Sequence, residues 1–132
     1  MSTLRTDTLV DKDHDADSID VSTLESGSAK AWVSFTGEGT VTINNDYNVN
    51  NVGDNGTGDY SINFSTNFAN ANYVFTGTFD DSWGAGTSCP HVVPQGDQGN
   101  TQNGNVCRIY TKDTQNGAAD ARRAYVSFIG AQ

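Results

Sequence analysis

The sequence predicts an all-β protein: an antiparallel β-sandwich of about seven to eight short strands with an extended N-terminal arm. Leucine occurs only at Leu4, Leu9 and Leu24, and the other apolar residues are mainly β-branched or aromatic, which favours strands. From Lys30 onward, apolar and polar residues alternate with a period of two. Segments rich in Asn, Asp, Ser, Thr and Gly, which favour turns, separate the alternating stretches.

Residues 1–29 differ in character from the rest and form the predicted arm. Residues 1–10 are typical of a single extended segment, and an acidic alternation follows it. Ser22 and Glu25 have the spacing of a capping box, but Gly27 follows closely, so we expect any helix to last about one turn. The arm has too few apolar residues for a core of its own, so we expect it to order against a partner.

The predicted sandwich domain spans residues 30–132 and opens with a clear alternation. Ala31, Val33 and Phe35 alternate with more polar neighbours. Between two later strands, the run Asp54–Gly58 (DNGTG) predicts a hairpin, because its Asn-Gly pair tolerates positive φ. The strands expected in the first part of the domain cover residues 31–36, 40–44, 47–52, 59–66 and 72–80.

Residues 81–104 break the pattern, since they contain both prolines and few apolar residues. A loop of this length in a small domain is usually functional or mobile. Strands resume over residues 105–112 and 121–129. Cys89 and Cys107 bracket the loop; a disulfide requires that they come within reach of each other, whereas a reducing cytoplasm favours free thiols.

The last predicted strand has apolar residues on both of its sides. Tyr125 and Ile129 lie opposite Ala124, Val126 and Phe128. A strand that is apolar on both faces is covered on both faces. In so small a domain another copy of the chain could provide the second cover, so the pattern indicates an oligomer.

Charge argues against two classes of partner. The formal net charge is −9, and no Lys or Arg occurs between Ala31 and Cys107. Nucleic-acid binding and binding to an anionic membrane surface both require clustered cations, so we expect neither. No apolar run approaches the roughly 20 residues that span a bilayer, and the first ten residues lack the apolar core of a signal peptide, so we expect synthesis in a cytoplasm without membrane insertion.

The acidic run from Asp11 to Asp17 has some features of a calcium-binding loop. However, Ala16 stands where the loop needs Gly, and Ser22 stands where it needs Glu. A solvated acidic linker is therefore the better interpretation, and we expect no metal site.

Other candidates for chemistry are equally incomplete. Cys89, His91 and Cys107 do not have the spacing of a four-ligand zinc site, and no flanking signature supports a Cys/His nucleophile. Asp80 and Asp81 are adjacent, so on a strand their side chains point to opposite faces, which disfavours an acid/base pair. We therefore expect no enzyme activity and no cofactor.

Trp83 is the most suggestive single residue for binding. An exposed Trp with Asp, Asn and Gln nearby could stack a sugar ring and bond its hydroxyls, whereas the alternative is a Trp that covers the end of the core. Trp32 is expected either to pack on the sandwich or to lie at a subunit interface. The candidate receptor contacts are Asp81, Trp83, His91, Gln95 and Asn100.

Four stretches of the chain resemble a known family. The stretch 31–43 (AWVSFTGEGTVTI) resembles the opening of small tail-fibre proteins of marine and cyanobacterial bacteriophages, and 54–64 (DNGTGDYSINF) resembles their hairpin. Residues 70–73 (NANY) and the start of the chain, Ser2 to Arg5 with Leu9, are similar to further segments of that family. The resemblance is specific over about residues 30–79 and looser at both ends.

The resemblance implies a homotrimeric, mostly β fibre tip that assembles on the virion tail in the host cytoplasm. Residues 1–29, with Leu4, Arg5 and Leu9 as anchoring candidates, would dock on a tail or baseplate protein. The distal loops would contact a glycan or protein of the host surface. The family defines no catalytic motif. A capsid-decorating or head-fibre protein, a carbohydrate-degrading tailspike and a cellular lectin-like module stay as alternatives.

Overall fold

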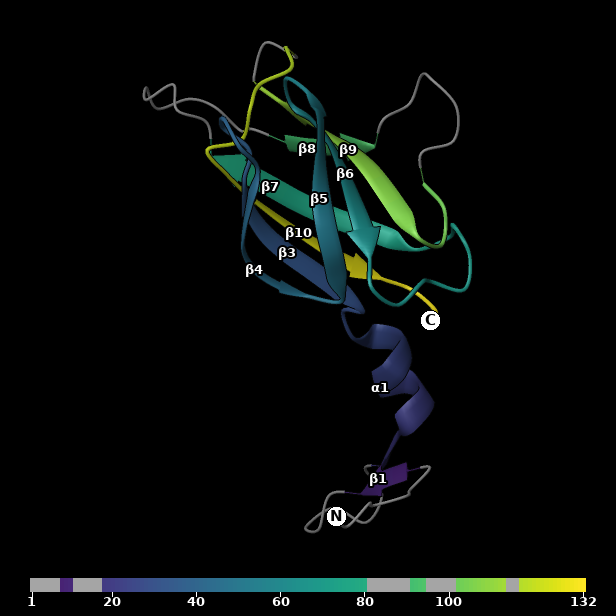
Figure 1. Ribbon diagram of the computed structural model, residues 1–132. Coiled ribbons are helices and arrows are strands. Elements are labelled where there is room, and N and C mark those ends of the chain that lie inside the picture. Colours follow the sequence, from purple (N-terminus) through teal and green to yellow (C-terminus); the bar gives the residue numbers. More distant parts are fainter. Residues whose placement is uncertain (1–7, 11–17, 81–90, 95–101, 114–116) are drawn as a thin grey trace.

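The computed structural model describes residues 8–10, 18–80, 91–94, 102–113 and 117–132 (Figure 1). Eight strands form two four-stranded antiparallel sheets. The first, called the β3 sheet, has the order β4 (Thr42–Tyr47), β3 (Ala31–Thr36), β10 (Arg123–Ile129), β7 (Val74–Asp80). The second, called the β6 sheet, has the order β5 (Val49–Gly56), β6 (Asp59–Phe64), β9 (Val106–Lys112), β8 (His91–Pro94).

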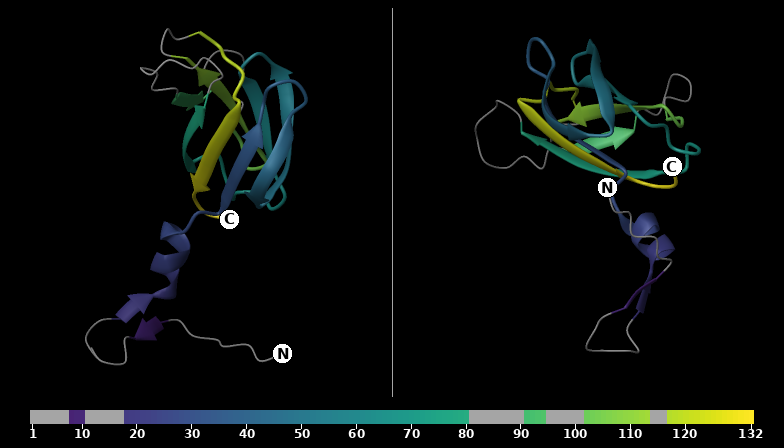
Figure 2. Two further views of the ribbon diagram at one scale, coloured as in Figure 1. Left: turned by 90° about the vertical axis from the view of Figure 1, so that its left-hand side faces the viewer. Right: turned by 60° about the horizontal axis from the view of Figure 1, so that its bottom comes forward.

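The two sheets pack face to face, as Figure 2 shows, so the predicted all-β sandwich is confirmed. The period-two pattern is also confirmed, because Ala31, Val33 and Phe35 are buried between more exposed neighbours. Aromatic rings from both sheets meet in the core; Phe64 of β6 contacts Phe128 of β10 edge-on at a centroid distance of 5.0 Å. Apolar burial between the sheets therefore accounts for the fold.

The predicted hairpin is confirmed, and its turn lies at the end of the predicted run Asp54–Gly58. Gly56 pairs with Asp59, so the loop consists of Thr57 and Gly58. The positive φ angles fall on Gly56 (134°) and Gly58 (65°). A register irregularity between Asp54 and Gly56 moves the turn, since a β-bulge adds a residue to one strand.

The strands predicted over residues 40–44 and 47–52, which precede this turn, are displaced along the chain. The structure has β4 over Thr42–Tyr47 and β5 over Val49–Gly56, with Asn48 between them. Asn48 has a φ of 56°, which Asn tolerates better than most residues. Its side-chain Nδ2 donates to the carbonyls of Lys30 and Thr66, each at 3.0 Å, so it forms a corner that joins three segments.

The segment predicted as one long loop, residues 81–104, contains the short strand β8 (His91–Pro94). It pairs with β9 at the edge of the β6 sheet, and edge strands are where sheets tolerate proline. Four residues that end in a proline are too short to reveal a period, which is why the sequence pattern missed this strand.

The N-terminal arm contains more local structure than the predicted extended segment. β1 (Thr8–Val10) pairs antiparallel with β2 (Ser18–Asp20), and α1 (Val21–Gly27) follows directly. The helix begins before Ser22, so Ser22 is not its N-cap, and its seven residues exceed the single turn expected. The described elements of the arm, β1, β2 and α1, lie beyond one end of the sandwich (Figures 1 and 2). Among the described residues no helix is long and apolar enough to cross a membrane.

Candidate binding face

Exposed hydrophobic side chains gather on one face of the sandwich. Among the described residues, six large hydrophobic side chains are exposed. Leu24 belongs to α1, and the others lie on the β3 sheet. Those on β3 and β10 alternate with buried residues, so their side chains point away from the core, and the two on β4 and β7 are direct cross-strand partners of Trp32 and Ile129. These five residues are Trp32, Tyr47, Val74, Tyr125 and Ile129. We call this surface the outer face of the β3 sheet.

Strand register places the two most central rings, those of Trp32 and Tyr125, near each other. Trp32 pairs with Ser127, and Tyr125 pairs with Ser34. The rings are therefore diagonal neighbours on β3 and β10, a relationship in which Cα atoms are typically about 7–8 Å apart. Trp32 is 37% exposed and Tyr125 is 46% exposed, so both rings can be touched from solvent.

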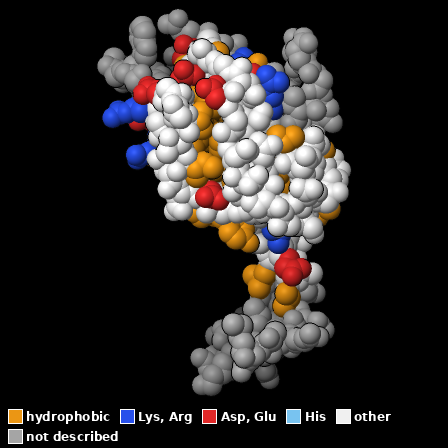
Figure 3. Space-filling model, viewed as in Figure 1, with side chains coloured by type: hydrophobic (Ala, Val, Ile, Leu, Met, Phe, Trp, Pro, Cys, Tyr) orange, Lys and Arg blue, Asp and Glu red, His pale blue; other side chains and the backbone are white. Residues whose placement is uncertain are grey.

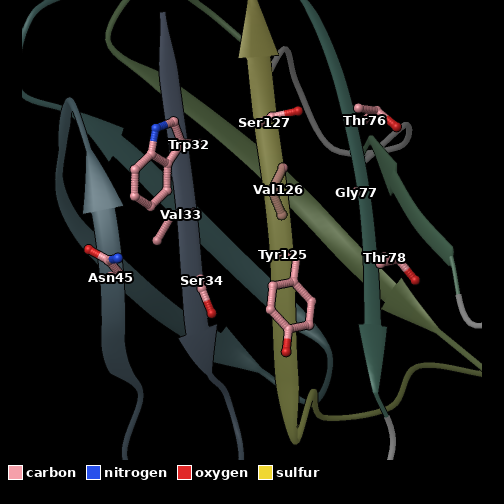
Figure 4. Close-up of a pocket in the computed structure, with 10 residues that line it drawn as sticks. All are labelled: Trp32, Val33, Ser34, Asn45, Thr76, Gly77, Thr78, Tyr125, Val126 and Ser127. Carbon is pink, nitrogen blue, oxygen red and sulfur yellow. The ribbon is translucent and has the colours of Figure 1, made fainter. Parts of the chain in front are cut away.

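An open depression of about 630 Å³ lies between these rings (Figure 4). Its floor is formed by Val33 and Val126, whose side chains are buried, and by Gly77. Around the rings stand hydroxyl and amide side chains, which belong to Ser34, Asn45, Thr76, Thr78 and Ser127. None of the described residues that line the depression is charged.

Several polar groups of the depression are not engaged by the protein. Within the described part of the chain, the side-chain hydroxyls of Ser34, Thr76 and Ser127 take part in no hydrogen bond with protein atoms. The Oδ1 of Asn45 accepts the backbone N–H of Asp46 at 3.0 Å, which leaves its Nδ2 facing away from that bond. The depression therefore offers both donors and acceptors to a ligand.

The outer face of the β6 sheet offers a ligand less than that of the β3 sheet, because Asp59 and Arg108 on it already bind each other. Asp59 is buried, and its carboxylate accepts Nε and Nη2 of Arg108 at 2.7 and 2.5 Å. Burial by itself raises the pKa of Asp59, but the hydrogen bond and charge of Arg108, with smaller help from Asn55, hold that pKa below its ordinary value. This bidentate pair fixes the hairpin to β9 and is structural.

A second polar network closes the end of the sandwich away from α1. The Tyr60 hydroxyl accepts the N–H of Ala121 at 3.2 Å and lies 3.3 Å from Asp120 Oδ1, which also accepts the N–H of Gly58 at 2.8 Å. Burial, with the nearby negative charge of Asp120, raises the pKa of Tyr60 to about 12. The phenol therefore stays protonated and serves to join loops.

Neither network resembles a centre for chemistry. In the described segments no three His, Cys, Asp or Glu side chains come together as metal ligands would. Cys107 is a buried free thiol, and burial raises its pKa to about 11, so little reactive thiolate forms near neutral pH. Cys89, with which the sequence left a disulfide open, lies outside the described residues.

Most residues predicted as contact sites also fall outside the described part of the chain. This is true of Asp81, Trp83, Gln95 and Asn100, and of the anchoring candidates Leu4 and Arg5. For two others the structure describes the backbone: His91 pairs with Lys112 in the β6 sheet, and Leu9 pairs with Ile19 in the arm.

The sequence did hold a signal for the outer face of the β3 sheet. Tyr125 and Ile129 interrupt the polar side of the last strand, and this pattern led to the expectation of a second cover. The signal was incomplete, because only the pairing of β3 with β10 brings Trp32 next to those residues.

No protein-family model, curated protein or solved structure matches this chain. The function is therefore inferred from the fold, the surface chemistry and the sequence motifs.

Proposed function

We propose that the chain is a virion structural protein, a short bacteriophage tail fibre that attaches to the tail through residues 1–29 and contacts the host surface with its distal loops. The motifs in residues 31–43 and 54–64 support this proposal, as does the all-β sandwich that carries them. The proposed activity is binding and not turnover of a substrate.

The observation that carries the proposal is the exposure of the arm. α1 has no buried residue, and Leu24 on it is exposed. A helix of seven residues is only marginally stable in water unless one of its faces packs against something. The arm therefore gains most from a partner that covers Leu24, and a tail or baseplate protein is that partner in our proposal.

The proposed anchoring and receptor-binding functions belong to opposite ends of the sandwich. Lys30, which follows the arm, donates its N–H to Phe128 at one end of β10. At the other end of β10, Arg123 pairs with Asp80, where the chain leaves β7. Asp80 precedes the segment that contains Asp81 and Trp83, so the proposed receptor contacts follow a strand end remote from the arm (Figure 1).

The largely uncharged surface of the sandwich supports binding to neutral partners. Uncharged groups cover most of the side shown in Figure 3, and most acidic side chains gather away from α1. We propose further that three copies assemble, because three weak sites acting together gain avidity over one.

Gold-labelled antibody on intact virions tests the location. Label on tails supports the proposal, and label on heads would favour a capsid-decorating or head-fibre protein. A chain that lacks residues 1–20 should fold normally by circular dichroism but be missing from virions. A matched full-length variant, Glu38→Gln, changes an exposed residue of the sandwich and should be incorporated normally. Incorporation of the shortened chain would refute the anchoring role.

A further inference from the structure

We infer that the depression between Trp32 and Tyr125 binds a neutral saccharide, in addition to any contact made by the distal loops. The inference rests on the proposed function, since it names a class of host-surface ligand for this protein. It assigns that ligand to the outer face of the β3 sheet, which is built from strands and not from loops.

The two rings provide a platform suited to a sugar. The C–H groups on one face of a pyranose pack well on an aromatic ring, and Tyr and Trp offer large contact area at a small cost in side-chain entropy. Trp32 and Tyr125 stand on adjacent, fully paired strands, so their backbones are fixed before the ligand arrives. Sites on strands hold their geometry better than sites on loops, and less ordering is required on binding.

The polar groups around the rings match the hydroxyls of a sugar. Ser34, Thr76 and Ser127 have hydroxyls that no protein atom engages within the described residues, and each can both donate and accept. The amide of Asn45 adds a further donor beside them. A volume of about 630 Å³ lies within the range of small-ligand sites and accommodates a few sugar units.

Charge selects the neutral class of saccharide. The lining that the described strands provide contains no charged side chain, whereas the whole chain carries a net charge of −9. A polyanionic saccharide would approach an acidic protein without finding a cation in the site, so it should bind less well.

Fluorescence of a single tryptophan gives a direct test. The chain has two tryptophans, so in Trp83→Phe the signal comes from Trp32 alone. This variant of the full chain is titrated with neutral hexasaccharides of glucose, galactose and mannose, and with a hexuronate of equal length. We expect a saturable change in Trp32 emission with at least one neutral hexasaccharide, and an affinity about tenfold or more weaker for the hexuronate.

Substitutions then locate the site by calorimetry with the hexasaccharide that binds. Trp32→Ala and Tyr125→Ala should each weaken binding about tenfold or more, and Ser34→Ala should weaken it less. Val74→Ala is the matched control, because Val74 is exposed on the same face, pairs with Ile129 and does not line the depression, and it should bind normally. Circular dichroism checks that every variant is folded.

The inference fails if no neutral hexasaccharide changes Trp32 emission, or if Trp32→Ala and Tyr125→Ala bind as well as the parent. Sedimentation of the same variants separates the other occupant: if the two substitutions lower the oligomeric mass and no saccharide binds, the face is covered by a second copy. Saccharide binding by the purified chain is independent of virion labelling. A negative result in one experiment is therefore distinguishable from a negative result in the other.

Discussion

Asp59 at the start of β6 holds Arg108 on β9 through two parallel hydrogen bonds, with N–O distances of 2.7 and 2.5 Å. The Asp59 side chain is 9% exposed and the Arg108 side chain 28% exposed, so the pair is only partly screened by water. The pair lies beside the β5–β6 hairpin and links that hairpin electrostatically to β9.

Substituting Asp59→Asn should lower the free energy of unfolding by about 1–3 kcal/mol, because Arg108 loses its charged acceptor while it stays partly buried. Urea denaturation followed by circular dichroism measures the change. Asp46→Asn serves as the control, since Asp46 is exposed and should alter stability little. Equal stability of the Asp59→Asn protein and the parent would show that the pair contributes nothing measurable.

The lowered pKa of Asp59 predicts a pH dependence of stability. A carboxyl whose pKa is lower in the folded state stabilises the fold fully above its unfolded pKa, here the ordinary value of 3.8, and that stabilisation is lost as pH falls through the folded pKa. The difference in unfolding free energy between the parent and Asp59→Asn should therefore be constant near neutral pH and shrink below about pH 4. A difference that grew on acidification would contradict the assignment.

Gly58 and Gly39 show two different reasons why a position requires glycine: a left-handed φ angle and a lack of room for a Cβ atom. Both have left-handed φ angles, 65° and 69°, but a Cβ at Gly58 would lie 2.6 Å from the carbonyl oxygen of Thr111, while a Cβ at Gly39 meets nothing within 4 Å. Gly39→Ala should cost about 1–2 kcal/mol from backbone strain alone. Gly58→Ala should cost clearly more, since backbone atoms must also move; thermal unfolding of both variants checks the order.

Cys107 should resist modification in the folded protein. Because burial raises the pKa of this thiol to about 11, a disulfide reagent at pH 8 should react with it at a negligible rate until the chain unfolds. The measurement uses Cys89→Ser, so that Cys107 is the remaining thiol. Rapid native reaction, at a rate like that in denaturant, would mean that Cys107 is accessible.

Much of the sandwich was predictable because the residues of several strands alternate between apolar and polar within the strand itself. The alternation in residues 31–36 and 59–66 fixes which side chains are buried, and Phe35, Ile62 and Phe64 are indeed in the core. Strand limits near Asn48 were less predictable, because the left-handed φ of that residue and its bonds to Lys30 and Thr66 depend on segments distant in sequence.

The sequence by itself determined the fold class and the buried side of the clearly alternating strands β3, β6 and β10, since both depend on local periodicity and composition. Only the tertiary structure decided that Trp32 and Tyr125 share one depression, because they lie far apart in the chain and meet through the pairing of β3 with β10. It also decided that Asp59 meets Arg108, since the strand register that joins them requires long-range hydrogen bonds that no local pattern specifies.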